Sequence, residues 1–324
     1  MQTKPIQEAV VSVFDIERLV HPLVEVCGYI EQALPDAPRE QFAAWGLPPE
    51  CERIEQRLLI PGPSDAFGSD GRGALRLVRF HGVGEQKVMR SSQRSWDTGG
   101  IFDVDMFSAD VDSIYRGLQR HGWTALGEPV DYSEAHFSVR QVVAIGPDGL
   151  VLAIIQRYAP FVNGLDPKGW LSPVFNSTQT VSDFDAAMRF YGEVLAFELR
   201  GEFTVEDVVE PGANVLGLPL PHAKAAQRRL AMFKPEGPSL GGVEFIQNLD
   251  MQGRRCDADC VAPNVGILAL RFEVEDAVAY AAQIEARGGT LDTPVMALEL
   301  APFGMVTLFS VRSPEGAVIE FYSI

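Results

Sequence analysis

The feature that most constrains the fold of this chain is an internal repeat. Residues 11–29 (VSVFDIERLVHPLVEVCGY) match residues 178–197 (TQTVSDFDAAMRFYGEVLAF), with Asp15 over Asp183. A repeat of this length is the mark of a duplicated structural unit, so it must be identified before any motif is interpreted. The same offset of 168 positions holds for about sixty residues and also places Arg76 over Glu244.

The second half of each repeat also matches. Residues 102–123 correspond to residues 270–289 with Asp110 over Asp276, an offset of 166 positions. The segment GPDGLVLAIIQ at 146–156 corresponds to SPEGAVIEFYS at 313–323. The two halves of the chain are therefore related to each other by duplication.

Each quarter of the chain shows the same order of predicted elements. A β-rich run comes first, followed by an acidic residue at a helix N-cap, an amphipathic helix, and three strands separated by Gly, Pro and Asp turns. In the third quarter, Ala187, Phe190, Tyr191 and Val194 recur at the spacing of one buried helix face after Asp183. The pattern predicts four βαβββ modules.

Composition limits the classes of function. The formal charge of −17 and pI near 4.7 oppose binding to a phosphate backbone, and no Lys/Arg cluster compensates. Four cysteines are too few and too unevenly spaced for a disulfide framework, which favours a reducing compartment. The longest apolar run is the six residues 150–155, far below the about 20 that a bilayer requires. We expect a cytoplasmic protein that binds neither nucleic acid nor membranes.

Several short segments resemble a known family. They are the openings VFDI and VSDF, the segment RFYGEVLAFEL at 189–199, and the closing turns PDG and PEG before a final strand. Together with the βαβββ order, they resemble the vicinal oxygen chelate superfamily of glyoxalases, extradiol dioxygenases and bleomycin resistance proteins. The resemblance implies an α+β fold in which two modules form one cup-shaped, eight-stranded mixed sheet with helices outside. Four modules imply two cups.

The resemblance also suggests a domain division. Modules one and two would form an N-terminal domain at residues 1–162, and modules three and four a C-terminal domain at residues 173–324, joined by a linker at 163–172. The strand pattern is equally compatible with an exchange of partners among the four modules, so both pairings stay open.

Metal-binding members of this family take one ligand from the first strand and one from the last strand of each module. Carried onto this sequence, the first-strand positions are Glu8, Asp103, Asn176 and Ala269. The last-strand positions are Arg76, Ala153, Glu244 and Glu320. None of the eight is a histidine.

The N-terminal set contains a cation at a ligand position. Arg76 has no lone pair for a metal ion, which argues against a divalent ion there. If Glu8 and Asp103 face Arg76, the three side chains would form a charge-balanced cluster or bind a polar ligand. A structural network of ion pairs is the preferred interpretation.

The C-terminal set is more complete. Asn176, Glu244 and Glu320 offer hard oxygen ligands suited to Mg²⁺, Mn²⁺ or Fe²⁺, and either glutamate would alternatively serve as a general base. Strand alternation places three further side chains on the same faces as ligand-binding candidates: Thr178, Arg271 and Tyr322. In the simpler alternative, Arg271 pairs with a carboxylate and the pocket binds a small molecule without converting it.

The histidines give weaker signals. His136 is the candidate for proton transfer on a strand of the second module, although an exposed strand-edge position competes with that role. His21, in the first predicted helix, is expected at the surface or in packing contacts. No dinucleotide-binding, P-loop or nucleophile-elbow motif is found, so no nucleotide cofactor is expected.

We therefore predict a protein that binds and converts a small, partly apolar organic molecule, with lyase, isomerase or ring-opening dioxygenase chemistry of the family type. The alternative is a non-catalytic binding or sequestering protein of the bleomycin-resistance type. The expected partner is a small-molecule ligand, with a homodimer left open beside a monomer.

Overall fold

Four βαβββ modules follow one another along the chain, as the repeat predicts. The computed structural model describes residues 3–62, 73–134, 137–206, 214–223, 227–235 and 241–324. Module one comprises β1 (Thr3–Ser12), α1 (Glu17–Glu25), β2 (Ile30–Ala33), α2 (Arg39–Ala44), β3 (Arg53–Ile60) and β4 (Ala74–His81). Module two comprises β5 (Asp103–Phe107), α3 (Val111–Arg120), β6 (Thr124–Ala125), β7 (Val130–Glu134), β8 (Phe137–Ile145), the 3₁₀ turn η1 (Pro147–Gly149) and β9 (Val151–Ala159).

The second half repeats this order. Module three comprises β10 (Asn176–Thr180), α4 (Phe184–Arg189), η2 (Phe190–Val194), β11 (Glu198–Glu206), α5 (Leu220–Ala223), β12 (Gln227–Lys234) and β13 (Val243–Asn248). A 3₁₀ turn, η3 (Asp257–Asp259), precedes module four. That module comprises β14 (Gly266–Val274), α6 (Ala277–Ala286), β15 (Leu291–Leu300), β16 (Gly304–Arg312) and β17 (Val318–Ser323).

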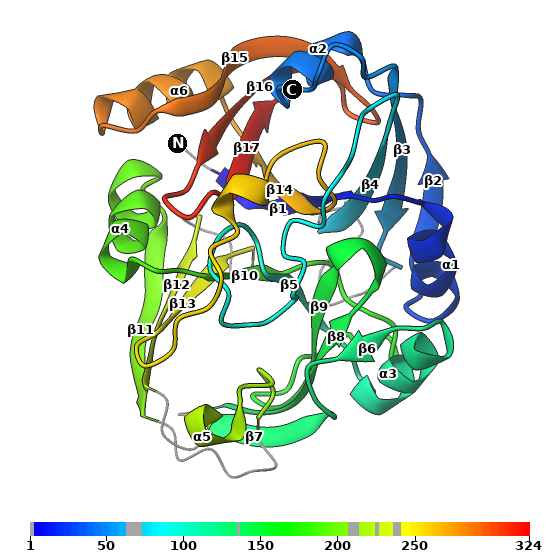
Figure 1. Ribbon diagram of the computed structural model, residues 1–324, viewed down its shortest axis with the longest axis vertical. Helices are drawn as coiled ribbons and strands as arrows, with labels where there is room; N and C mark the ends of the chain where they lie inside the picture. The colour runs from blue at the N-terminus through cyan, green and yellow to red at the C-terminus, as the bar shows by residue number, and fades with distance from the viewer. Residues whose placement is uncertain (1–2, 63–72, 135–136, 207–213, 224–226, 236–240) are drawn as a thin grey trace.

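The modules pair in the exchanged arrangement. One mixed sheet has the order β15-β16-β17-β14-β1-β4-β3-β2 and joins modules one and four through the antiparallel pair β1 and β14. The other has the order β11-β12-β13-β10-β5-β9-β8-β6, with β7 paired to β8, and joins modules two and three through β5 and β10. The first sheet occupies the upper half of Figure 1 and the second the lower half. Each sheet thus draws on both halves of the chain, and a division at residues 163–172 does not separate the two cups.

The second sheet has nine strands instead of the expected eight. The extra strand arises because the segment that follows α3 is split into β6 and β7, both of which pair with β8. The glyoxalase-like α+β architecture is otherwise as predicted.

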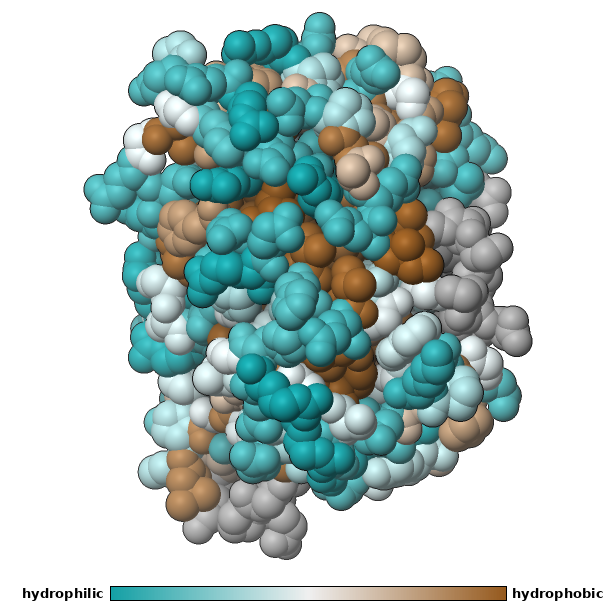
Figure 2. Space-filling view, turned by 90° about the vertical axis from the view of Figure 1, so that its right-hand side faces the viewer, coloured by the Kyte–Doolittle hydropathy of each residue, from teal (hydrophilic) through white to brown (hydrophobic). Residues whose placement is uncertain are grey.

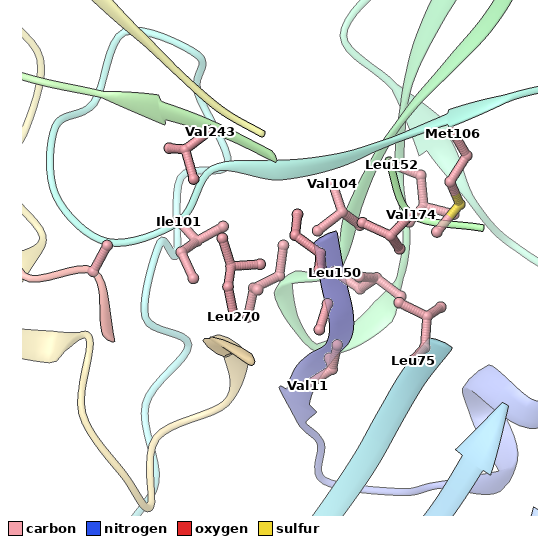
Figure 3. Close-up of a cluster of buried hydrophobic side chains, with 14 of the residues drawn as sticks. Val11, Leu75, Ile101, Val104, Met106, Leu150, Leu152, Val174, Val243 and Leu270 are labelled. Atoms are coloured by element: carbon pink, nitrogen blue, oxygen red, sulfur yellow. The ribbon is translucent and has the colours of Figure 1, made fainter. Parts of the chain in front are cut away.

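One face of each sheet packs into a core that both sheets share. Strand alternation directs Val11, Leu75 and Leu270 from the first sheet toward Val104 and Leu152 from the second, and Figure 3 shows these side chains gathered between the strands. Buried faces of α1, α3, α4 and α6 complete this core. The residues at the family's ligand positions alternate with these core residues, so they lie on the opposite face of each sheet.

Aspartate side chains cap three of the four module helices. Asp110, Asp183 and Asp276 each accept a hydrogen bond from the backbone N–H three residues later, at 2.9, 2.9 and 3.0 Å. Such a cap satisfies an N–H group that has no partner within the helix. The first helix differs from the prediction: its N-cap is Ile16, and Asp15 instead accepts from the N–H of Glu17.

No helix among the described segments is long and apolar enough to cross a bilayer. Figure 2 shows a face covered mainly by hydrophilic side chains, with a strip of apolar side chains between them. The four cysteines are free and buried.

Candidate functional site

Three ligand positions of the first sheet hold Glu8, Arg76 and Glu320, and Arg271 lies two residues after the fourth, Ala269. Glu8 on β1 lies directly across from Arg271 on β14. Arg76 donates to both oxygens of Glu8, from Nε at 2.8 Å and from Nη2 at 2.7 Å, while Arg271 Nη1 donates to Glu8 Oε2 at 2.7 Å. Arg271 also donates from Nε to Glu320 Oε2 at 2.8 Å. The result is a continuous, charge-neutral chain of four side chains, Arg76–Glu8–Arg271–Glu320.

Neighbouring groups form hydrogen bonds with both ends of this network. Trp45, at the C-terminal end of α2, donates to Glu320 Oε1 at 2.6 Å. Arg76 Nη1 donates to Gln56 Oε1 at 2.8 Å and Nη2 to the carbonyl of Ala301 at 2.6 Å. None of the four charged side chains is more than 1% exposed. Buried charges of this kind persist only when paired and hydrogen-bonded, as they are here.

The pKa of Glu8 shows how burial and the neighbouring positive charges balance. Burial alone would raise the pKa of Glu8, but attraction by Arg76 and Arg271, with their hydrogen bonds, outweighs burial and holds it below its ordinary value of 4.5. Burial would likewise lower the pKa of Arg271, whereas Glu320 and Glu8 raise it above the usual range. Both residues therefore stay ionised at neutral pH.

This first site does not fit a metal ion. Guanidinium groups have no lone pair to donate, and they occupy two of its four central positions. Tyr322, predicted to bind ligand, is fully buried in the same sheet and stacks on Phe303 with ring centroids 5.3 Å apart. The preferred sequence interpretation, a structural ion-pair network, agrees with this geometry.

On β5 of the second sheet, Asp103 lies at a ligand position and Asp105 corresponds to Arg271 of the first sheet. Asp103 and Asp105 lie two residues apart on β5, so their side chains share a face, and they pair with Thr178 and Asn176 of β10. Asn176 Nδ2 donates to Asp105 Oδ2 at 2.6 Å, and the Thr178 N–H donates to Asp103 Oδ1 at 3.2 Å. The two carboxyl groups are close enough for each to alter the pKa of the other.

The pKa values of this pair are both raised. Burial is the largest cause for Asp103, followed by repulsion from Asp105, and Glu244 adds a further repulsive contribution. Burial also raises the pKa of Asp105 to about 6, although hydrogen bonds from Asn176 and Asp103 act in the opposite direction. Because the pKa of Asp103 is raised the more strongly, Asp103 is the carboxyl group that holds a proton and Asp105 is the one that ionises first.

The surroundings combine polar and apolar groups. Glu244 on β13 is half-buried and pairs with Thr178, while Met232 on β12 lies across from Glu244. Ala153 lies across from Asp105 and packs with Val143, Val151 and Phe102. Asn176, Glu244 and Met232 all retain partial exposure, unlike the fully buried quartet of the first sheet. The second site is therefore the more exposed of the two at these three side chains.

Two loops cover this face. Val215 packs on the cluster around Ala153, and Gly217 approaches the backbone of Leu126 so closely that a Cβ would lie 2.7 Å from its carbonyl oxygen. Thr180 donates to the carbonyl of Ser95 at 2.6 Å, and Ser95 donates to the carbonyl of Leu216 at 2.6 Å. The loop of module three thus packs onto strands of module two.

A divalent ion fits this second site only incompletely. The donors are all hard oxygens, and Asp105 Oδ1 is buried without a hydrogen-bond partner. However, the ligand atoms of Asp103, Asp105 and Glu244 are not close enough together to bind one ion. Among the described residues, only His21, Glu25 and His121 form a group of three His, Cys, Asp or Glu side chains that could do so. The present side-chain arrangement therefore suits a proton better than a metal.

The structure regroups the residues predicted from the sequence. Asn176 and Glu244 lie in the second sheet, whereas Glu320 lies in the first beside Arg271, so these three do not form one metal site. Arg271 pairs with a carboxylate, as the simpler alternative expected, but it does so in the first sheet with Glu8. Asp103 is separated from Glu8 and Arg76, because exchange of the modules places them in different sheets. His136 lies outside the described residues.

Two residues of the second site were missed by the sequence reasoning. Asp105 follows Asp103 in the segment DVD, and strand alternation alone would have placed both on one face. Arg90, in the long loop before β5, is buried, stacks over Phe102 at 5.1 Å and interacts electrostatically with Asp103. No local pattern marks Arg90, because the contact depends on how the loop returns to the sheet.

Comparison with known proteins now identifies the family. Residues 174–321 match the model of the Glyoxalase/Bleomycin resistance protein/Dioxygenase superfamily. This part of the chain belongs to that superfamily. The resemblance to vicinal oxygen chelate proteins that the sequence suggested is confirmed, and the sequence matches none of the curated proteins with which it was compared.

Solved structures extend the likeness to the whole chain. Glyoxalase I from Zea mays superposes with a TM-score of 0.63 at 15% identity, covering 98% of this chain and 92% of the maize protein. A putative dioxygenase from Bacillus subtilis superposes with a TM-score of 0.61 at 10% identity, covering 99% and 86% of the two chains. At these identities the likeness concerns the fold, and all four modules of the chain take part in it.

Proposed function

We propose that the second sheet of this protein binds a small, partly apolar organic molecule and transfers a proton to or from it, with Asp103 and Asp105 as the acid and base. The pair of buried carboxyl groups with raised pKa values carries the proposal. Two buried carboxyl groups with separated pKa values supply one group that holds a proton and one that accepts one. A base with a pKa near 6 is largely ionised at pH 7 and still basic enough to accept a proton.

The neighbouring groups support these roles. Asn176 donates to Asp105 and orients it, and the backbone of Thr178 holds Asp103. Met232, which is partly exposed across from Glu244, supplies apolar surface that suits the organic part of a ligand. The chemistry that fits is abstraction of an acidic C–H proton next to a carbonyl, as in an isomerase or lyase.

The first sheet has no part in this chemistry. Its equivalent positions are filled by the Arg76–Glu8–Arg271–Glu320 network, which is closed to solvent. We assign it a structural role. No step of the proposed proton transfer depends on a divalent cation, and addition of Mg²⁺, Mn²⁺ or Fe²⁺ is included below as a separate arm.

Solvent deuterium exchange tests the proposal without requiring the complete reaction. Protein in D₂O is incubated with a panel of α-hydroxy ketones and of thiol adducts of 2-oxoaldehydes, with and without each cation, and loss of the C–H signal is followed by ¹H NMR. We expect the wild type to catalyse exchange. The exchange rate should fall at least about a hundredfold in Asp105→Asn and in Asp103→Asn, because a general acid or base contributes about that much.

The control is Asp131→Asn, which makes the same change on β7 of the same sheet at an exposed side chain. It should exchange at the wild-type rate. Wild-type exchange should also rise with pH through about 6, because Asp105 must be ionised to accept the proton. Undiminished exchange in Asp105→Asn would contradict the assignment, and a panel member that binds but never exchanges would indicate a binding protein instead.

A further inference from the structure

A second cluster of chemically active side chains lies outside both sheets. It joins α1 of module one to the end of α3 of module two, two helices that lie next to each other on the right of Figure 1. Glu25 Oε2 is 3.4 Å from His21 Nε2 and 3.5 Å from His121 Nε2. One ligand atom from each of the three residues lies within 4.8 Å of the other two.

These distances fit metal ligands better than hydrogen bonds. An N–H to oxygen hydrogen bond measures about 2.7–3.2 Å, so both contacts are longer than expected for a strong bond. Two ligands bound tetrahedrally at about 2.0–2.2 Å from a zinc ion are themselves about 3.4 Å apart. The two imidazole rings meet at 73°, with centroids 5.1 Å apart, so both Nε2 atoms are able to approach one point.

The backbone holds the three residues in this arrangement. His21 and Glu25 are four residues apart on α1 and therefore share one face of the helix. His121 is the C-cap of α3, and Gly117 of α3 packs so closely on Val26 that a Cβ would lie 2.3 Å from Cγ1 of Val26. This close contact sets the distance between the two helices at the level of the cluster.

The internal repeat provides a comparison within the same chain. At the offsets that relate the two halves, His21 corresponds to Arg189, Glu25 to Glu193 and His121 to Arg287. Arginine at both positions excludes a metal ion there, and Arg287 instead donates to the carbonyl of Val194 at 3.4 Å. The two equivalent positions are thus histidines at one helix pair and arginines at the other.

We propose that His21, Glu25 and His121 bind one divalent transition-metal ion, such as Zn²⁺, Ni²⁺ or Co²⁺. Imidazole with a carboxylate is the donor set that these ions favour, and three protein ligands leave a fourth position for water. The ion links helices from modules that belong to different sheets. It would therefore stabilise the packing of the two sheets, independently of the proton transfer proposed above.

Metal titration of the full-length protein tests this site. After removal of metals with a chelator, Co²⁺ and Zn²⁺ are added and followed by visible absorption and calorimetry. The wild type should bind one equivalent at this site, and the unfolding temperature should rise with metal concentration. His21→Gln and His121→Gln should each weaken binding at least about tenfold, since loss of even a residue that supports a ligand has that effect.

The matched control is His81→Gln. His81 Nε2 also lies close to a carboxylate, Glu55, at 3.0 Å, but among the described residues no second histidine joins that pair. This variant should bind metal like the wild type, and Asp105→Asn should too, which separates the site from the carboxyl pair. Because His21 is 70% exposed, its replacement leaves the fold intact. Wild-type affinity in both His21→Gln and His121→Gln, or equal weakening in His81→Gln, would overturn the proposal.

Discussion

Replacement of Glu8 by glutamine tests whether the buried network of the first sheet stabilises the fold. The side chain keeps its shape, but its charge is lost, and Arg76 and Arg271 then face each other without the carboxylate between them. Three charge-assisted hydrogen bonds of 2.7–2.8 Å are weakened or lost. Removing one partner from a buried ion pair costs about 3–5 kcal/mol, because the remaining charge stays buried.

That cost translates into a measurable change in melting temperature. An unfolding entropy of about 2.1 cal/mol/K per residue over 324 residues gives about 0.7 kcal/mol/K, so Glu8→Gln should melt about 4–7 °C below the wild type. Calorimetry or circular dichroism at pH 7 measures the shift. The control, Glu50→Gln, makes the same change at an exposed loop position and should melt within about 1 °C of the wild type.

Two further measurements separate the network from ordinary packing. In the double variant Glu8→Gln/Arg76→Met, the loss should be about 1–3 kcal/mol smaller than the sum of the single losses, because the pair is removed together. The pKa of Glu8 is lowered in the folded state, so the ionised carboxylate stabilises the fold at neutral pH. This contribution to the free energy of unfolding is lost as the pH falls through the pKa of the folded state, which lies below 4.5. Additive losses, or a Glu8→Gln shift under about 1 °C, would refute this account.

Other predictions concern the second sheet and the helix caps. The pKa of Asp105 is raised from 3.8 to about 6, so the folded state binds the proton more tightly than the unfolded state does. The free energy of unfolding should therefore fall by up to about 3 kcal/mol as the pH rises from about 4 to 7. Urea titrations should show a flatter dependence of this free energy on pH for Asp105→Asn. Asn176→Ala removes the amide that donates to Asp105, so the pH midpoint of deuterium exchange should move above 6. Asp110→Ala removes the N-cap of α3 and should cost about 0.5–2 kcal/mol, whereas Asp166→Ala, in an exposed turn, should cost less than about 0.5 kcal/mol in the same melting assay.

The likeness to glyoxalase I and to a putative dioxygenase concerns the fold, while the two sites of this chain have diverged from each other. Equivalent positions hold Glu8 and Arg271 in one sheet and Asn176 and Asp105 in the other. In the first sheet the opposite charges neutralise each other and exclude a ligand. In the second, burial raises the pKa of both Asp103 and Asp105.

Local patterns in the sequence were sufficient to predict the modules. The repeat, the helical periodicity after Asp183 and the turns before the last strands depend on interactions within one module, which residues close in sequence determine. The aspartate caps of α3, α4 and α6 were predicted for the same reason. The arginine at position 76 was sufficient to argue against a metal ion in its site, because a guanidinium has no lone pair wherever its partners lie.

The tertiary structure alone decided which modules meet. Each first strand must pair antiparallel with the first strand of another module, and the sequence allows more than one partner; the observed choice places Glu8 beside Arg271, 263 residues away along the chain. That pairing separated Glu320 from Glu244 and brought Asp105 to Asn176. It also placed His121 beside Glu25. Long-range packing in the core shared by the two sheets selects among pairings that are locally equivalent, so the composition of each site could not be read before the fold was known.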